Sequence, residues 1–280
     1  IKRKAVLPVF VHGSTGMKKL VEDDEPREVD ALLADLDRDD TDMWLRQLDY
    51  YVKLHQLSDQ SLGMILDAMD DIGGWDDTIL IFTADHGDQC GSHGLRSKGP
   101  WNYQETMRIP LYMVAPGVTR PATTSHSLTS AVDLARTIAE FAGVNVANIP
   151  TLQGESMRPL FEDQTAKIRD YVLFSQEWAW WPGVETCRYA SSGMFDGRHK
   201  YCRYYGVGGG YNAWGQKFAG DEMLYGRDAA FDEHDHEMYD LQEDPHELVN
   251  LALDRGLRHD VHSRFGELRS IEHQVYANGF

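Results

Sequence analysis

The stretch that decides the fold is TILIFTADHGDQCGSHGLRSK, residues 78–98. It opens with the apolar run TILIF and then places two aspartates, two histidines, three glycines and a lysine within residues 83–98. A short, nearly all-apolar run that comes after a helix is typical of a parallel strand buried on both faces. Ligands of open α/β sheets bind beyond the carboxyl ends of the strands, so the polar residues predict a site there.

The neighbouring segments predict an alternation of helix and strand. Apolar residues recur every three or four positions from Thr41 onward, which indicates a long helix that Gly73 and Gly74 end, with a break near Ser58. The run at 109–115 (IPLYMVA) predicts a second strand. Residues 130–142 predict a helix that ends at a glycine. This order predicts an α/β fold with a doubly wound, mostly parallel sheet flanked by helices.

The pattern changes after about residue 160. Short strand-like pieces such as 171–176 and 200–204 are separated by Gly, Asp and Asn, which indicates a smaller antiparallel sheet. A last helix is predicted over 257–276. We therefore expect two domains, with residues 1–160 in the large α/β domain and 161–280 in a smaller antiparallel α+β subdomain.

Composition excludes several classes of function. The chain has 280 residues and a formal net charge of −18, which disfavours nucleic acid as a partner. No apolar run approaches the roughly 18–20 residues that cross a bilayer, so no membrane partner is expected. Three widely spaced cysteines predict reduced thiols rather than a disulfide framework. The sequence leaves the compartment and assembly into a homo-oligomer open.

Asp85 and His86 come where the first predicted strand ends. A hard carboxylate oxygen and an imidazole nitrogen suit Ca²⁺, Mg²⁺ or Mn²⁺ if further carboxylates join them. Lys98 brings a compact cation that could meet an anionic group at such a metal. His93 could transfer a proton near neutral pH. The alternative is a polar turn that merely closes the strand.

This stretch and the residues after it resemble the second half of the sulfatase family, within the alkaline phosphatase superfamily. In that family an apolar strand ends in a DHG-type motif, and then come G-x-H-G, a lysine, a tyrosine with an acid, and R-[IV]-P-L. The corresponding residues here are Asp85-His86-Gly87, Gly91-Ser92-His93-Gly94, Lys98, Tyr103 with Glu105, and Arg108-Ile109-Pro110-Leu111. Residues 130–160 and 237–251 resemble two later segments of the same family, in the right order.

The resemblance implies hydrolysis of a small anionic sulfate ester with one divalent metal ion, of which Ca²⁺ is favoured over Mn²⁺ and Mg²⁺. Asp85 and His86 then correspond to metal ligands, and Lys98 to the lysine that holds the ester oxyanion. His93 would either contact the site or orient the loop. The family's formylglycine nucleophile arises from C/S-x-P/A-x-R, which this sequence does not contain. We expect the nucleophile in an N-terminal portion of the same enzyme, and this segment alone to be inactive.

Two alternatives stay open at this point. A histidine at position 86 is similar to the phosphonate monoester and phosphodiester hydrolases on the same scaffold. A non-catalytic sulfatase-like protein also fits a chain without a nucleophile.

Two further stretches, one aromatic and one rich in histidine, each allow a functional or a structural interpretation. Trp178, Trp180 and Trp181 could bind the alcohol part of a substrate, or could pack one domain on the other. His234 and His236 invite a metal interpretation, but a surface turn is favoured.

Overall fold

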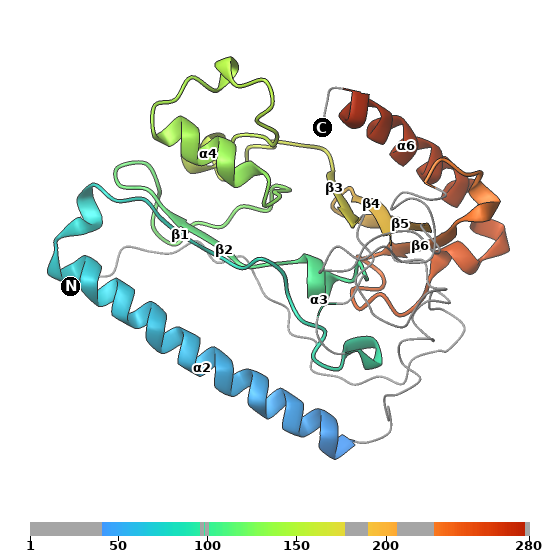
Figure 1. Cartoon of the computed structure of the whole chain (residues 1–280), viewed down its shortest axis with the longest axis horizontal. Coiled ribbons are helices and arrows are strands. Elements are labelled where there is room, and N and C mark those ends of the chain that lie inside the picture. The colour runs from blue at the N-terminus through green and yellow to red at the C-terminus, as the bar shows by residue number, and fades with distance from the viewer. Residues whose placement is uncertain (1–40, 96–97, 99–100, 177–189, 206–226, 278–280) are drawn as a thin grey trace, which may run out of the picture. The chain divides into compact units, whose positions relative to one another are not determined.

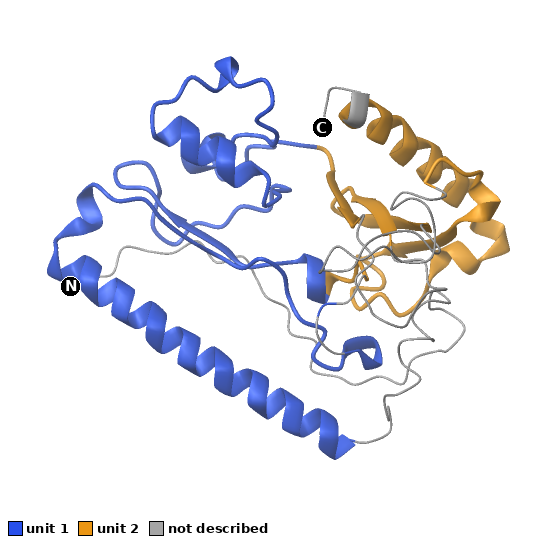
Figure 2. Cartoon of the chain, viewed as in Figure 1, with its two compact units in different colours: residues 1–17, 37–98, 105–169 blue, residues 18–36, 99–104, 170–280 orange. Residues whose placement is uncertain are grey.

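The computed structural model describes residues 41–95, 98, 101–176, 190–205 and 227–277 (Figure 1). These residues form two compact units (Figure 2). Unit 1 contains the described residues up to 98 and those at 105–169, and unit 2 contains 101–104 and everything described from 170 onward. The units therefore divide at 169/170, whereas the sequence suggested a limit near 160. None of the described helices is long and apolar enough to cross a membrane.

Unit 1 is built from helices and one pair of strands. Its elements, in chain order, are α2 (Thr41–Asp71), η1 (Gly74–Asp76), β1 (Leu80–Thr83), η2 (Ser92–Gly94), α3 (Gln104–Met107, of which Gln104 belongs to unit 2), β2 (Leu111–Val114), α4 (Asp133–Phe141), η3 (Val146–Asn148) and α5 (Arg158–Glu162).

Helix α2 runs without interruption, so the break expected near Ser58 was wrong. Serine and the polar residues after it cost only a few tenths of a kcal/mol in a helix, too little to interrupt one. The predicted stop is confirmed, because Gly73 adopts the left-handed conformation with φ 63°. Gly143 ends α4 in the same way, with φ 76°.

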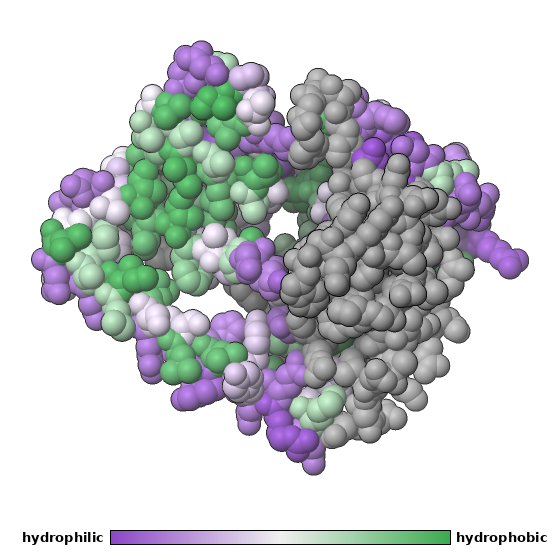
Figure 3. Space-filling model, viewed as in Figure 1, coloured by the Kyte–Doolittle hydropathy of each residue, from purple (hydrophilic) through white to green (hydrophobic). Residues whose placement is uncertain are grey.

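Strands β1 and β2 pair antiparallel, with Ile81 opposite Met113. The parallel arrangement expected for them was therefore wrong for this pair. A parallel connection needs a crossover, usually a helix, and the described residues between these strands form only the short η2 and α3. The expectation that β1 is buried on both faces was also wrong, since Phe82 is 39% exposed. Figure 3 shows apolar side chains, in green, gathered on the face of unit 1 that is turned toward the viewer.

The apolar core of unit 1 lies under β2. Met113 and Ala115 pack with Met157 and Phe161, so the segment around α5 contributes directly to this core. Asp133 at the start of α4 is fully buried, and its carboxylate accepts hydrogen bonds from the backbone N–H groups of Ser130 and Glu155, each at 2.8 Å.

Unit 2 is a four-stranded antiparallel sheet with a terminal helix. Its elements are β3 (Val172–Gln176), β4 (Ala190–Phe195), β5 (His199–Tyr205), η4 (Phe231–Glu233), β6 (Asp235–Asp240), η5 (Leu251–Leu253), η6 (Arg255–Leu257) and α6 (Arg258–Ala277). The strands lie in the order β3-β4-β5-β6, and each neighbouring pair is antiparallel.

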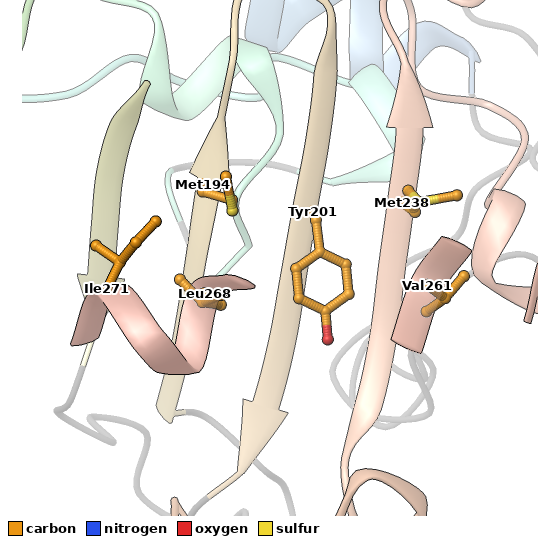
Figure 4. Packing of buried hydrophobic residues seen from close by; sticks show 6 residues of the cluster. All are labelled: Met194, Tyr201, Met238, Val261, Leu268 and Ile271. Atoms are coloured by element: carbon orange, nitrogen blue, oxygen red, sulfur yellow. The ribbon is translucent and has the colours of Figure 1, made fainter. Parts of the chain in front are cut away.

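One face of this sheet packs against α6. Figure 4 shows the side chains of this core between the strands and the helix. They are Met194, Tyr201, Met238, Val261, Leu268 and Ile271. The salt bridge from Arg203 to Glu272, at 2.5 Å, ties β5 to α6.

The sheet also carries a buried polar cluster. Burial raises the pKa of the Glu237 carboxyl, although three tyrosine hydroxyls donate hydrogen bonds to it and so favour its charged form. These hydroxyls belong to Tyr103 at 3.2 Å, Tyr204 at 2.6 Å and Tyr239 at 3.1 Å. Strand β4 is buried on both faces, unlike the half-exposed strands that are common in antiparallel sheets.

Gly193 in β4 gives a test of this packing. A Cβ atom at this position would lie 2.3 Å from the Phe174 ring and 2.7 Å from the Tyr201 carbonyl oxygen. We expect Gly193→Ala to lower the free energy of unfolding by about 1–3 kcal/mol through overpacking, as measured by urea denaturation.

Gly266 in α6 is the matched control, because a Cβ atom there meets nothing within 4 Å. Gly266→Ala should raise stability by about 0.5–1 kcal/mol, since alanine is the better helix former. Equal effects of the two substitutions would contradict the packing described for β4.

Candidate functional site

The segment after β1 places Asp85 and His86 side by side. The His86 backbone N–H donates a hydrogen bond to Asp85 Oδ1 at 2.9 Å, and Asp85 Oδ2 lies 3.4 Å from His86 Nε2. The hydrogen bond from this backbone N–H, and then the nearby His86 ring, lower the pKa of the Asp85 carboxyl. The Asp85 side chain is 85% exposed, so its ionised oxygens are accessible.

The hydrogen bonds of His86 fix its tautomer. Nδ1 lies 2.8 Å from the Gly87 carbonyl oxygen, which can only accept, so Nδ1 carries the proton. In the neutral ring Nε2 then has a free lone pair, and it accepts a hydrogen bond from Lys98 Nζ at 2.7 Å. A ring that donates from one nitrogen to a backbone carbonyl and presents the other is the arrangement of most metal-binding histidines.

The structure thus brings together three residues that the sequence singled out. Lys98 is exposed, and it reaches back twelve positions to contact His86. Asp85 and His86 form a pair of potential metal ligands, and in the described parts of the chain no group of three or more His, Cys, Asp or Glu side chains could hold a metal ion.

His93 lies in a different environment from Lys98. It is buried at the centre of η2 with a left-handed φ of 56°, and its Nε2 lies 3.9 Å from Glu105 Oε2. A buried ring next to a carboxylate on α3 favours the role of orienting the loop over direct contact with a substrate.

Cys90 is not an activated nucleophile. Its thiol donates a hydrogen bond to Asp88 Oδ1 at 3.2 Å. Burial, and then this hydrogen bond and the negative charge of Asp88, raise the pKa of the Cys90 thiol to about 12. A reactive cysteine requires the opposite, a lowered pKa near a cation or a helix N-terminus.

The sequence interpretation missed two residues near the site and understated a third. Gln89 and Thr106 are both buried, and the Gln89 amide donates to the Thr106 hydroxyl at 2.7 Å. A Cβ atom on Gly87 would lie 1.8 Å from the Glu105 carbonyl oxygen, so the loop backbone is pressed against α3. The sequence marked Gly87 as the glycine of the DHG motif that lets the backbone turn, but not its close contact with α3, and no local pattern marks Gln89 or Thr106.

The sequence also singled out a group of tryptophans and a pair of histidines. Trp178, Trp180 and Trp181 lie outside the described residues. His234 and His236 do not form a surface turn: His234 is buried, and the His236 ring stacks on Phe231 with 4.1 Å between centroids. His236 also faces the Tyr201 hydroxyl at 2.8 Å, so both of its ring nitrogens have protein partners.

Comparison with known proteins identifies the family. The sulfatase family model matches residues 13–144, and the model of the N-sulphoglucosamine sulphohydrolase C-terminal region matches residues 91–224. An N-acetylglucosamine-6-O-sulfatase of Bacteroides thetaiotaomicron is 28% identical over 193 residues, which cover 69% of this chain and 30% of that protein.

Solved structures agree on the fold. A protein determined in complex with its substrate D-glucosamine-2-N,6-O-disulfate superposes with a TM-score of 0.61 at 24% identity, covering 79% of this chain and 39% of that one. The phosphonate monoester hydrolase of Agrobacterium radiobacter gives 0.58 at 24% identity, covering 77% and 39%.

The chain belongs to the sulfatase family, a family of sulfuric ester hydrolases in the alkaline phosphatase superfamily. The predicted fold class, α/β with a smaller C-terminal antiparallel subdomain, is confirmed. The chain spans about a third of the length of the relatives reported above.

The reactivity of Cys90 tests the electrostatics of the loop. At pH 8 a thiol with a pKa near 8.5 is about one quarter thiolate, whereas a pKa of about 12 leaves roughly one part in ten thousand. We expect iodoacetamide to leave Cys90 unmodified at pH 8 in the folded protein, as read by peptide mass spectrometry. From this low value the rate should rise about tenfold with each pH unit, and unfolding should raise it sharply at pH 8.

Asp88→Asn provides the comparison. Removing the negative charge should lower the pKa of the thiol and speed alkylation at least severalfold at the same pH. Rapid modification of Cys90 in the unsubstituted protein would contradict the assigned environment.

Proposed function

We propose that this chain contributes part of the active site of an enzyme that hydrolyses a small anionic sulfate ester. The observation that carries the proposal is the contact of Lys98 Nζ with His86 Nε2 beside the exposed Asp85 carboxylate. Membership in the sulfatase family supports the reaction class. The sulfated glucosamine derivatives named for the relatives make a sulfated amino sugar a reasonable first substrate to assay.

Asp85 and His86 would hold one divalent metal ion. The fit rests on the tautomer of His86, which directs an unprotonated Nε2 toward the side of the ring where Asp85 Oδ2 lies. Ligands of Ca²⁺ sit about 2.3–2.6 Å from the ion, so two atoms 3.4 Å apart can share one. Ca²⁺ is favoured, with Mn²⁺ and Mg²⁺ as alternatives, and the ion would supply positive charge for the transferring group.

Lys98 would act as an anion clamp. The lone pair on His86 Nε2 that now accepts from Lys98 is the one that a metal ion would occupy. Binding of a cation there would release the ammonium group, which can then donate its hydrogen bonds to an ester oxygen. A positioned ammonium stabilises charge that grows on that oxygen in the transition state.

An N-terminal portion of the same enzyme is proposed as the partner of unit 1 and as the source of the nucleophile, a formylglycine. Unit 1 exposes large apolar side chains on α2 and β1, including Leu48, Val52, Ile65 and Phe82. Removing such surface from water contributes about 25 cal/mol per Å². A further portion of the fold that covers these elements would therefore be strongly favoured.

A phosphonate monoester or phosphodiester is the second candidate substrate. His86 supports it, together with a fold shared with a phosphonate monoester hydrolase. Both reactions place negative charge on oxygens next to a metal and an ammonium group, so the local residues serve either one.

The test compares matched substrates in the intact enzyme that contains this chain. Aryl sulfate, glucosamine 6-sulfate and aryl phosphonate esters, the aryl pair with the same leaving group, are assayed for kcat/KM. We expect a preference for a sulfate ester of at least about tenfold. A preference for the phosphonate would select the second candidate, and no turnover of any ester would indicate a non-catalytic sulfatase-like protein.

Metal binding provides a separate test. Asp85→Asn should weaken Ca²⁺ binding at least about tenfold, as measured by titration calorimetry, because a neutral amide replaces an ionised ligand. Asp163→Asn is the matched control, since Asp163 is also an exposed aspartate whose carboxylate accepts a local backbone hydrogen bond, from Thr165 at 2.9 Å. Equal Ca²⁺ affinity of the two variants would contradict the assignment of Asp85.

A further inference from the structure

Thr106 in α3 contacts the loop at two places that flank the candidate site. Its hydroxyl donates a hydrogen bond to the Lys98 carbonyl oxygen at 3.2 Å. Its own carbonyl oxygen accepts from the backbone N–H of Gly87 at 2.8 Å. One residue is therefore bonded to the backbone of Lys98 and to the backbone directly after His86.

The direction of these hydrogen bonds is determined by the groups that make them. The Gln89 amide nitrogen can only donate, so the Thr106 hydroxyl oxygen accepts from it at 2.7 Å. The hydroxyl proton is then available for the Lys98 carbonyl, which can only accept. The hydroxyl group makes both bonds with a single oxygen atom, accepting one and donating the other.

Burial makes these bonds costly to lose. Gln89 is 1% exposed and Thr106 is 8% exposed, so water does not readily replace either partner. The contact of Gly87 with the Glu105 carbonyl leaves the loop no room to move toward α3. Steric contact with α3 thus holds the loop at Gly87, and the Thr106 hydroxyl holds it at Gln89 and Lys98.

We propose that Thr106 is a positioning residue that holds the backbone of Lys98 beside His86. This inference rests on the proposed function, in which Lys98 stabilises charge on the ester oxygen. Thr106 touches neither side chain of the pair, and it acts through the backbone of Lys98 and of Gly87. Small displacements of a catalytic group cost up to about a hundredfold in rate, so a loosened backbone at Lys98 should lower kcat.

The experiment uses the intact enzyme and four variants. Thr106→Val removes the hydroxyl and keeps the shape, and Thr106→Ser keeps the hydroxyl. Thr137→Val is the matched control, because Thr137 in α4 is also buried, donates to the Asp133 carbonyl at 2.7 Å and accepts from the Met157 N–H at 3.0 Å. Lys98→Ala shows the full effect of losing the ammonium, which we expect to be about tenfold to a hundredfold in kcat/KM.

We expect Thr106→Val to lower kcat about tenfold with KM changed less than about twofold. Thr106→Ser should retain kcat within about twofold. Thr137→Val should lower Tm by a similar amount to Thr106→Val but leave kcat unchanged. If the Thr106 hydroxyl had only a structural role, Thr106→Val and Thr137→Val would lower Tm by similar amounts and would also have the same effect on kcat.

Two outcomes would overturn the inference. If Lys98→Ala loses activity while Thr106→Val and Thr137→Val behave alike, Thr106 does not position Lys98, although the proposed function stands. If the enzyme turns over no ester, the proposed function fails, and a crystal structure of Thr106→Val decides the inference by itself. In a metal-free crystal, the Lys98 Nζ to His86 Nε2 contact, 2.7 Å in the unsubstituted chain, should be lost in this variant, and its persistence would contradict the positioning role.

Discussion

The candidate site depends on one steric constraint, the close approach of Gly87 to the backbone of α3. A side chain at position 87 would overlap the Glu105 carbonyl group, so only glycine permits the contact. The contact lets the Gly87 N–H reach the Thr106 carbonyl, which fixes the direction of the chain directly after His86. The geometry of the site is therefore determined by a missing Cβ atom more than by attraction between charged side chains.

Much of the fold could be predicted from local patterns, and part of it could not. The ends of α2 and α4 could be located at Gly73 and Gly143, because a left-handed residue after a helix is a local requirement. The antiparallel pairing of β1 with β2 could not be predicted in this way, because an apolar run specifies burial but not the direction of its partner. The described residues between the two strands form no crossover helix, and this was the overlooked signal.

The same distinction applies to the site. Asp85, His86 and Lys98 were identified because their side chains have recognisable chemistry, and the structure brings them together. Thr106 was missed because its role depends on a buried partner seventeen positions away, Gln89, and on backbone groups that no residue pattern encodes. Residues that touch a substrate are therefore easier to find in a sequence than the residues that hold them in place.

The carboxylates of Glu237 in unit 2 and of Asp85 in unit 1 lie in opposite environments. Glu237 is wholly buried and satisfied by three tyrosine hydroxyls, whereas Asp85 is exposed beside an unprotonated imidazole nitrogen and is available for a metal ion. Cys90 is by residue type the strongest nucleophile in residues 83–98, yet burial and Asp88 keep it protonated. A neutral thiol adds no negative charge to residues 83–98, and in the proposed function a metal ion and Lys98 would bring positive charge to the ester. This suits the proposed role of the loop, which is to bind the anionic ester while the nucleophile is proposed to come from another part of the enzyme.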